Sequence, residues 1–241
     1  MEQKSEEREW LEPTAEIIRK KVAMQEEYEA LLEKEYCDRT RVLAEALQEL
    51  NETYDFCDRI FEENGKKGLM DIKGDIRVPA LYTDFFERYD YDENRNYPVA
   101  AADESGKYAL VAADGTGKPL SDFIYDAIYT PYFSKSFITK SGNKYGVISL
   151  EGKEIVPAVM DACTDVLNGI MVVEADGKEG VATDCGLYIV PEYDEISEKD
   201  DFVYARKGDM WGYFSESGEF IPESDTDRLD DENRLNYGSF I

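Results

Sequence analysis

Histidine is absent from the 241 residues of the chain. Without imidazole there is no Ser-His-Asp triad, no Cys-His dyad and no zinc site that needs a histidine ligand. Four cysteines are present, and they show neither a C-x-x-C pair nor the dense spacing of a disulfide framework. We therefore expect no catalytic residue, no cofactor and no metal. Reduced thiols and a cytoplasmic location are the simplest interpretation. The four cysteines are Cys37, Cys57, Cys163 and Cys185.

Long apolar runs are also missing. No stretch approaches the ~18–20 apolar residues that span a bilayer, and the charged first ten residues contain no apolar core of a signal peptide. Basic residues are scarce: the chain has 27 basic and 54 acidic residues, for a net charge of −27. Such a surface repels phosphate backbones and anionic lipids. We expect no nucleic-acid or membrane partner, and a basic protein is the partner that this charge favours.

Glycine does not occur before position 65, and only one of the eight prolines precedes it. The rest of the chain holds all 17 glycines and seven prolines. Because glycine and proline mark turns, this contrast predicts two architectures. We expect a helical cap over residues 1–63 and a β-rich domain over residues 64–241, which is an α+β fold with the two kinds of structure segregated.

The first segment has the apolar spacing of helices. One stripe recurs every three or four residues from Leu43 to Phe61, and an earlier stripe that begins at Ile18 does not stay in phase with it. A break near Cys37 to Thr40, with Asp38 in the position of a helix N-cap, predicts a helical hairpin. This hairpin either packs on the β-rich domain as a cap or forms a homodimer or docking interface.

The second segment repeats itself. Five short strings end at residues 68, 109, 146, 180 and 212, which are 41, 37, 34 and 32 apart. A glycine follows each end by six residues and a proline by ten or eleven. These coincidences indicate an internal repeat. The strings are Gly65-Lys-Lys-Gly68, Gly106-Lys-Tyr-Ala109, Lys144-Tyr-Gly146, Gly177-Lys-Glu-Gly180 and Met210-Trp-Gly212.

Each repeat reads as strand, tight turn and strand. In the third repeat, residues 145–150 are β-branched and apolar, Gly152 is placed for a hairpin turn, and Pro157 ends the returning strand or lies at a sheet edge. A Tyr-Asp-like step and a third strand follow. The glycine of each string leaves room for a neighbouring ring or backbone. We expect about five three-stranded antiparallel meanders in an open, twisted array, with propeller-like closure as the alternative.

Two strings carry a family resemblance. Residues 144–157 (KYGVISLEGKEIVP) and 210–222 (MWGYFSESGEFIP) resemble the WG-repeat family, and the likeness extends over about residues 64–222. Three repeats depart from the pattern, with Lys67 in place of the aromatic residue, Ala109 in place of the glycine, and Glu179 before its glycine. The resemblance implies a bacterial β-repeat module without catalytic residues. The family is associated with toxin–immunity loci and with surface proteins.

Acidic residues and tyrosines coincide in the expected loops. Tyrosine buries area at low entropic cost, and opposite charge accelerates encounter with a basic protein. We expect a non-catalytic protein-binding repeat, in its most specific form an immunity protein that masks a basic toxin or effector. A structural scaffold or cell-surface module is one alternative, and an enzyme with an unrecognised carboxylate site is another. The candidate partner-binding residues are Tyr89, Asp90, Tyr91, Asp92, Glu93, Tyr129, Tyr132, Tyr193, Asp194, Glu195, Glu198, Asp200 and Asp201.

Overall fold

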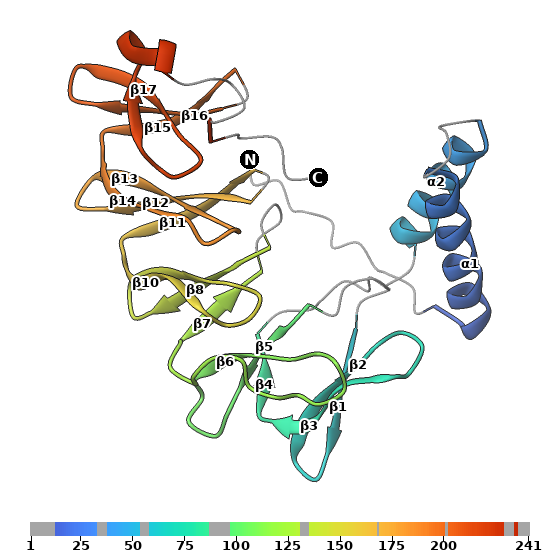
Figure 1. The fold of residues 1–241 in the computed structure, drawn as a ribbon. Coiled ribbons are helices and arrows are strands. Elements are labelled where there is room, and N and C mark those ends of the chain that lie inside the picture. The colour runs from blue at the N-terminus through green and yellow to red at the C-terminus, as the bar shows by residue number, and fades with distance from the viewer. Residues whose placement is uncertain are drawn as a thin grey trace, which may run out of the picture.

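The computed structural model shows two helices followed by a curved, open array of five antiparallel sheets (Figure 1). It describes residues 13–32, 38–53, 58–86, 97–130, 135–167, 169–200, 202–228 and 234–235. The chain is α+β with its helices at the N-terminal side, and among the described strands no sheet closes on another to form a ring.

The helical hairpin breaks where the apolar phase changes. Helix α1 covers Ala15–Leu32 and α2 covers Asp38–Thr53. The hydroxyl of Thr14 accepts a hydrogen bond from the Ile17 N–H at 3.3 Å and so caps α1. On α2 the stripe residues Leu43, Leu47 and Leu50 are all buried. Cys37, Tyr54 and Cys57 lie outside the described residues.

The helical prediction for residues 59–63 is wrong, because Arg59–Glu63 forms strand β1. Asn64 and Gly65 both have positive φ, which is the backbone of a two-residue hairpin turn, and β1 pairs with the next strand through it. Phe61 therefore does not extend the stripe of α2. Its ring lies over Gly68 on the neighbouring strand, where a side chain would collide with it.

The five sheets follow one another along the chain. The first holds β1, β2 (Lys66–Met70) and β3 (Ile76–Tyr82), and the second holds β4 (Asp84–Phe85), β5 (Val99–Ala102) and β6 (Tyr108–Val111). The third holds β7 (Ala127–Tyr129), β8 (Phe137–Ser141), β9 (Lys144–Ile148) and β10 (Glu154–Met160). The fourth holds β11 (Ala162–Leu167), β12 (Ile170–Ala175), β13 (Lys178–Thr183) and β14 (Tyr188–Tyr193). The fifth holds β15 (Glu195–Lys199), β16 (Phe202–Lys207), β17 (Met210–Phe214) and β18 (Phe220–Pro222), and a 3₁₀ helix, η1, follows at Glu223–Arg228.

Two details of the expected repeat differ. Three sheets have four strands, and the strand expected to close one unit pairs instead with the unit that follows it: β12 lies between β11 and β13. Each sheet therefore begins about half a repeat earlier in the chain than the repeat unit defined from the sequence. Of the two positions predicted for Pro157 the sheet edge is confirmed, because it lies within β10, the edge strand of its sheet, and does not end that strand. At the edge its missing N–H removes no hydrogen bond to another strand.

The core lies between the sheets. Each of four apolar clusters joins one sheet to the next, and neighbouring residues on a strand face opposite clusters: Val147 faces the fourth sheet and Ile148 the second. Because the inner sheets are covered on both faces, their strands are apolar in consecutive positions rather than in alternation. The helices contact the array through a smaller cluster that joins Leu50 to Ile72, in the turn between β2 and β3.

Glycines adopt the two roles that the repeat predicts. The turn glycines Gly74, Gly115, Gly152, Gly186 and Gly218 all have positive φ. At Gly146 and Gly180 an added Cβ would lie under 3.0 Å from backbone atoms of the adjacent edge strand. The pairings of β9 with β10 and of β13 with β14 are irregular at these places. The glycines therefore admit a bulged edge strand at close range.

Candidate binding surface

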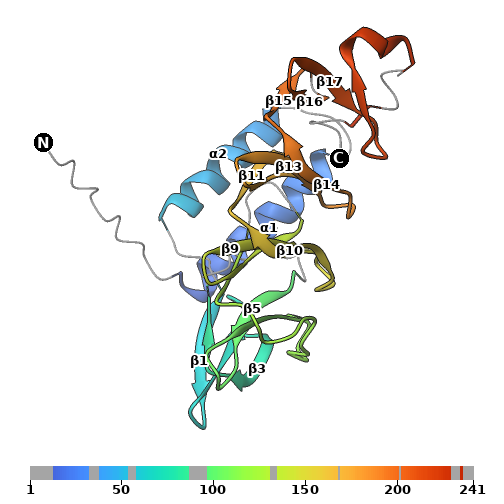
Figure 2. The same ribbon diagram turned by 90° about the vertical axis from the view of Figure 1, so that its left-hand side faces the viewer.

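One residue separates consecutive sheets at three of the four joins, and at the other Asp126 follows the segment whose Tyr125 forms an isolated bridge with Tyr108 of the second sheet. Thr83, Asp126, Asp161 and Asp194 stand between the last segment of one sheet and the first strand of the following sheet. The backbone N–H of each donates to a carbonyl of the next sheet, at 2.9, 2.8, 2.7 and 2.8 Å respectively. These short connections run down one side of the array, and the helices stand on the other side (Figure 1). Figure 2 views the side with the connections, and the helices lie behind it.

The junction aspartates connect consecutive sheets with both carboxylate oxygens. Asp126 accepts from Lys107 Nζ at 2.5 Å and from the Gly142 N–H at 2.6 Å. Asp161 accepts from Lys144 Nζ at 2.5 Å and from the Asp176 N–H at 3.0 Å. In each case the lysine belongs to the preceding sheet and the N–H to a hairpin turn of the following one.

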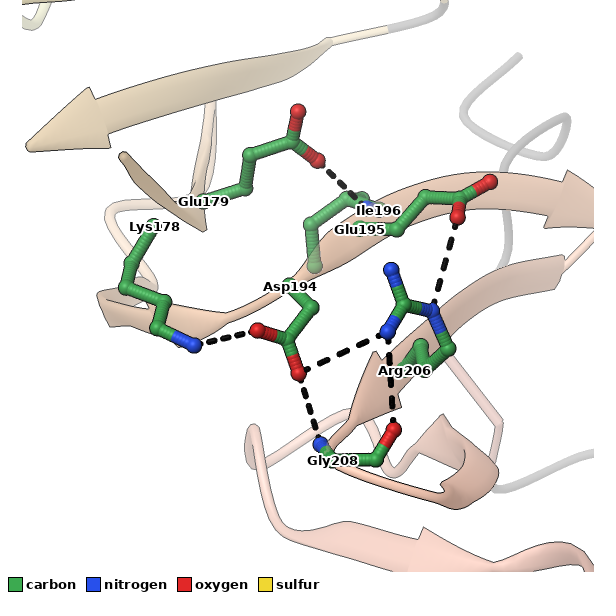
Figure 3. A network of polar contacts seen from close by, with 7 residues as sticks. All are labelled: Lys178, Glu179, Asp194, Glu195, Ile196, Arg206 and Gly208. Carbon is green, nitrogen blue, oxygen red and sulfur yellow. Dashed lines mark hydrogen bonds and ion pairs between the residues drawn. The ribbon is translucent and has the colours of Figure 1, made fainter.

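The junction at Asp194 adds further charges (Figure 3). Asp194 pairs with Lys178, accepts from the Gly208 N–H at 2.6 Å, and lies 3.7 Å from Arg206 Nη1. Arg206 Nε also lies 3.6 Å from a carboxylate oxygen of Glu195, one residue further along the chain. This candidate site residue therefore belongs to a network that fixes the fifth sheet against the fourth.

Hydrogen bonding changes the acidity of these groups. The lysine ammonium holds the pKa of each junction carboxyl below its ordinary value, with the backbone N–H as the next cause, at Asp126, Asp161 and Asp194. The carboxylates thus stay charged at neutral pH and keep their lysines engaged. The Tyr-Asp-like step was visible in the sequence, but its lysine partners were missed because they lie 16 to 19 residues earlier.

Apart from Asp194 and Tyr193, the candidate partner-binding residues fall into three groups. Glu195, Glu198 and Asp200 are exposed, on β15 and in the turn that follows it. Tyr129 is half-buried on β7, where its ring meets Phe86 edge to face with centroids 5.0 Å apart. The others lie outside the described residues: Tyr89, Asp90, Tyr91, Asp92, Glu93, Tyr132 and Asp201.

Tyr193 is not on a loop surface, and its expected exposure is wrong. It ends β14, is only 3% exposed, and packs between Phe214 and Phe220 in the cluster that joins the last two sheets. Burial raises the pKa of its phenol to about 12. The repeat frame explains this result, because Tyr82 and Tyr125 precede their junction residues in the same way and are also buried.

Sequence reasoning also missed a set of exposed aliphatic side chains. Leu81, Ile124 and Val159 each precede a junction residue by two positions, and their exposed fractions are 54, 54 and 55%. The fourth repeat has Glu192 at this position, and Val190, two residues earlier on β14, is 53% exposed. We call Leu81, Ile124, Val159 and Val190 the aliphatic row. Its signal was present in three of the four repeats, as one apolar residue directly before the buried side chain that precedes the junction residue.

An open cavity of about 510 Å³ lies beside Ile124, between the second and third sheets. Its walls combine apolar and acidic groups, and the turn at Gly152 abuts the backbone of Leu120 there. The lining residues are Pro119, Leu120, Ser121, Asp122, Ile124, Tyr125, Gly152 and Glu154. Asp122 and Glu154 are both exposed.

Other kinds of site find little support among the described residues. They contain no group of three or more potential metal ligands. Cys163 and Cys185 are free thiols. Within the described ranges, neither helix has the length and apolar character needed to cross a membrane.

Comparisons with known proteins identify no family for this chain. No protein-family model matches it, and no curated protein matches it. Among solved structures it is similar to one described as the crystal structure of the eukaryotic initiation factor, with a TM-score of 0.34 and 10% identity. The similarity covers 77% of this chain and 54% of the other, so this chain spans about half the length of that structure.

Proposed function

We propose that this protein is a non-catalytic, protein-binding member of the WG-repeat family that binds a basic protein. The observation that carries the proposal is the excess of carboxylates. Even if every one of the 27 cations were paired with one acid, 27 of the 54 carboxylates would remain. Many of these cations already serve the scaffold, as at the junction lysines Lys107, Lys144 and Lys178.

The architecture supports a binding role. Five stacked sheets with short turns give a rigid elongated support, and repeat arrays present such extended surfaces to partners. The close-packed glycines and the turn glycines support the family assignment, because they occupy the positions that the repeat pattern reserves for them. In its most specific form, the proposal is an immunity protein that acts in the cytoplasm and masks the cationic surface of a toxin or effector.

Affinity capture tests this function. The immobilised full chain is offered a panel of basic proteins and a size-matched panel of neutral ones, together with the products of neighbouring genes. We expect capture of a basic protein that weakens steeply between about 50 and 500 mM salt, because screening shortens the range of charge attraction. Capture that is unaffected by salt, or equal capture of neutral proteins, would refute the electrostatic mechanism.

A further inference from the structure

The aliphatic row is a regular feature of the array. Large aliphatic side chains scattered singly over a surface are ordinary, but three members of this row occupy the same position in successive repeats. Strands β3 and β10, which carry Leu81 and Val159, have the same sequence of exposed and buried positions. The stacking of sheets therefore places one exposed aliphatic group per repeat beside the inter-sheet connections.

The spacing expected from stacked sheets fits a simple partner. Stacked sheets lie about 10 Å apart, and side chains seven residues apart on a helix are separated by about 10.5 Å along its axis. One face of an amphipathic helix can therefore place an aliphatic side chain against each repeat. The edge strands themselves are poor templates for an added strand, since β3, β10 and β14 each contain a proline.

The surroundings of the row select the charge of that partner. The cavity beside Ile124 has Pro119 and Leu120 as apolar walls and two carboxylates, Asp122 and Glu154, at its lining. A lysine or arginine side chain lays its methylene stem on apolar surface and keeps its charged end near carboxylates. A second copy of this chain would bring a net charge of −27 against −27.

We propose that the aliphatic row is the docking face for a cationic amphipathic helix of the partner, and that the cavity between the second and third sheets receives one of its lysine or arginine side chains. This inference rests on the proposed function and names the face that performs it. The aliphatic contacts would supply the salt-insensitive part of the affinity, and Asp122 and Glu154 a salt-sensitive part.

The test uses the full chain and a fluorescein-labelled synthetic helical peptide of about four heptads, with leucine at every seventh position, lysine or arginine at two positions of each heptad and alanine elsewhere. Binding is followed by fluorescence anisotropy in 50 mM salt. The row variant combines Leu81→Thr, Ile124→Thr, Val159→Thr and Val190→Thr. Its matched control combines four exposed apolar positions elsewhere, Val42→Thr, Ile60→Thr, Ile76→Thr and Met210→Thr. Neither variant changes the net charge.

We expect roughly tenfold weaker binding for the row variant and less than about twofold for its control. A second pair tests the cavity: Asp122→Asn with Glu154→Gln should weaken binding and reduce its salt dependence. Glu16→Gln with Glu216→Gln, which removes the same charge from exposed positions elsewhere, should change both less. If circular dichroism shows that the fourfold variant is unfolded, the single substitutions Leu81→Thr and Val159→Thr replace it. Each should weaken binding partially.

Three results would overturn the inference. These are absence of peptide binding by the native chain, equal weakening by the row variant and its control, and a native dimer in sedimentation that the row variant alone dissociates. None of them removes salt-dependent capture of basic proteins, which tests the proposed function separately. Conversely, if the native chain captured no basic protein but still bound the peptide, the proposed function would be refuted and the docking face would stand.

Discussion

The second and third sheets carry different residues at the glycine position of the repeat, alanine in the second sheet and glycine in the third. The third has Gly146, and the edge strand β10 approaches it so closely that a Cβ would collide with backbone atoms of Val156 and Ala158. The second has Ala109, which is fully buried, and the chain that returns beside it forms no regular strand. That chain pairs with β6 at two isolated bridges, Val111 with Pro119 and Tyr108 with Tyr125, and the Ser121 hydroxyl accepts a hydrogen bond from the Leu110 N–H at 2.9 Å.

This difference shows what the glycine of the repeat does. A side chain at that position separates the edge segment from its neighbour, so the second sheet keeps three strands while the third has four. The irregular returning segment also forms much of the cavity beside Ile124. The departure from the repeat pattern at Ala109 therefore coincides with the surface cavity beside Ile124.

The most disruptive test converts the third sheet toward the second. Gly146→Ala should lower the free energy of unfolding by about 2–3 kcal/mol, because its methyl group would overlap backbone that cannot move without breaking the β9–β10 pairing. The converse variant, Ala109→Gly, should cost only about 1 kcal/mol, from a lost buried methyl and a more flexible chain. Urea unfolding measures both. Equal effects would contradict the role assigned to the glycine.

Hydrogen exchange tests the same contrast without mutation. Amides of β10 are expected to exchange about tenfold more slowly on average than those of residues 112–124, because the latter segment pairs with its sheet at isolated bridges. Mass spectrometry of peptides from the two segments gives the measurement. Similar protection of both would mean that strand β10 adds little local stability.

The junctions offer a milder contrast. Asp161→Asn removes the charge that pairs with Lys144 but keeps an oxygen able to accept from the Asp176 N–H, so we expect the melting temperature to fall by a few degrees at most. Thr83→Ala should do less, because the first junction has no aspartate at this position. There Asp84, one residue later, pairs with Lys67 instead. A larger loss at Thr83 would reverse this ranking.

The smallest expected effect depends on pH. The pKa values of Asp126, Asp161 and Asp194 are lowered in the folded chain, so their stabilisation is present above the ordinary carboxyl pKa of about 4 and is lost as pH falls through the folded values. The difference in stability between the native chain and Asp161→Asn should therefore be constant at neutral pH and shrink below about pH 4. Thermal unfolding from pH 7 to pH 3 measures it, and a difference that grows on acidification would contradict the assigned pKa direction.

Much of the architecture could be predicted from residue spacing. The turn glycines, the break between the helices and the buried faces of α2 follow from local geometry, because each depends on a few neighbouring residues. Strand β1 was misjudged because Phe61 fits a helical stripe, and the Asn64-Gly65 turn that overrides it lies just beyond. Of the candidate site, Glu195 and Glu198 were expected in a loop and lie exposed on strand β15. Tyr193 was expected to be exposed and is buried, because its ring is enclosed by residues 21 and 27 positions later.

The sequence by itself determined that the chain is strongly acidic, lacks histidine, and repeats one turn-rich unit after a helical segment. These are properties of composition and of short-range backbone preference. Only the tertiary structure decided which strands share a sheet, that Asp126, Asp161 and Asp194 connect consecutive sheets, and that Leu81, Ile124, Val159 and Val190 are exposed. Such facts depend on contacts between residues far apart in the chain, and hydrophobic burial between whole sheets selects them.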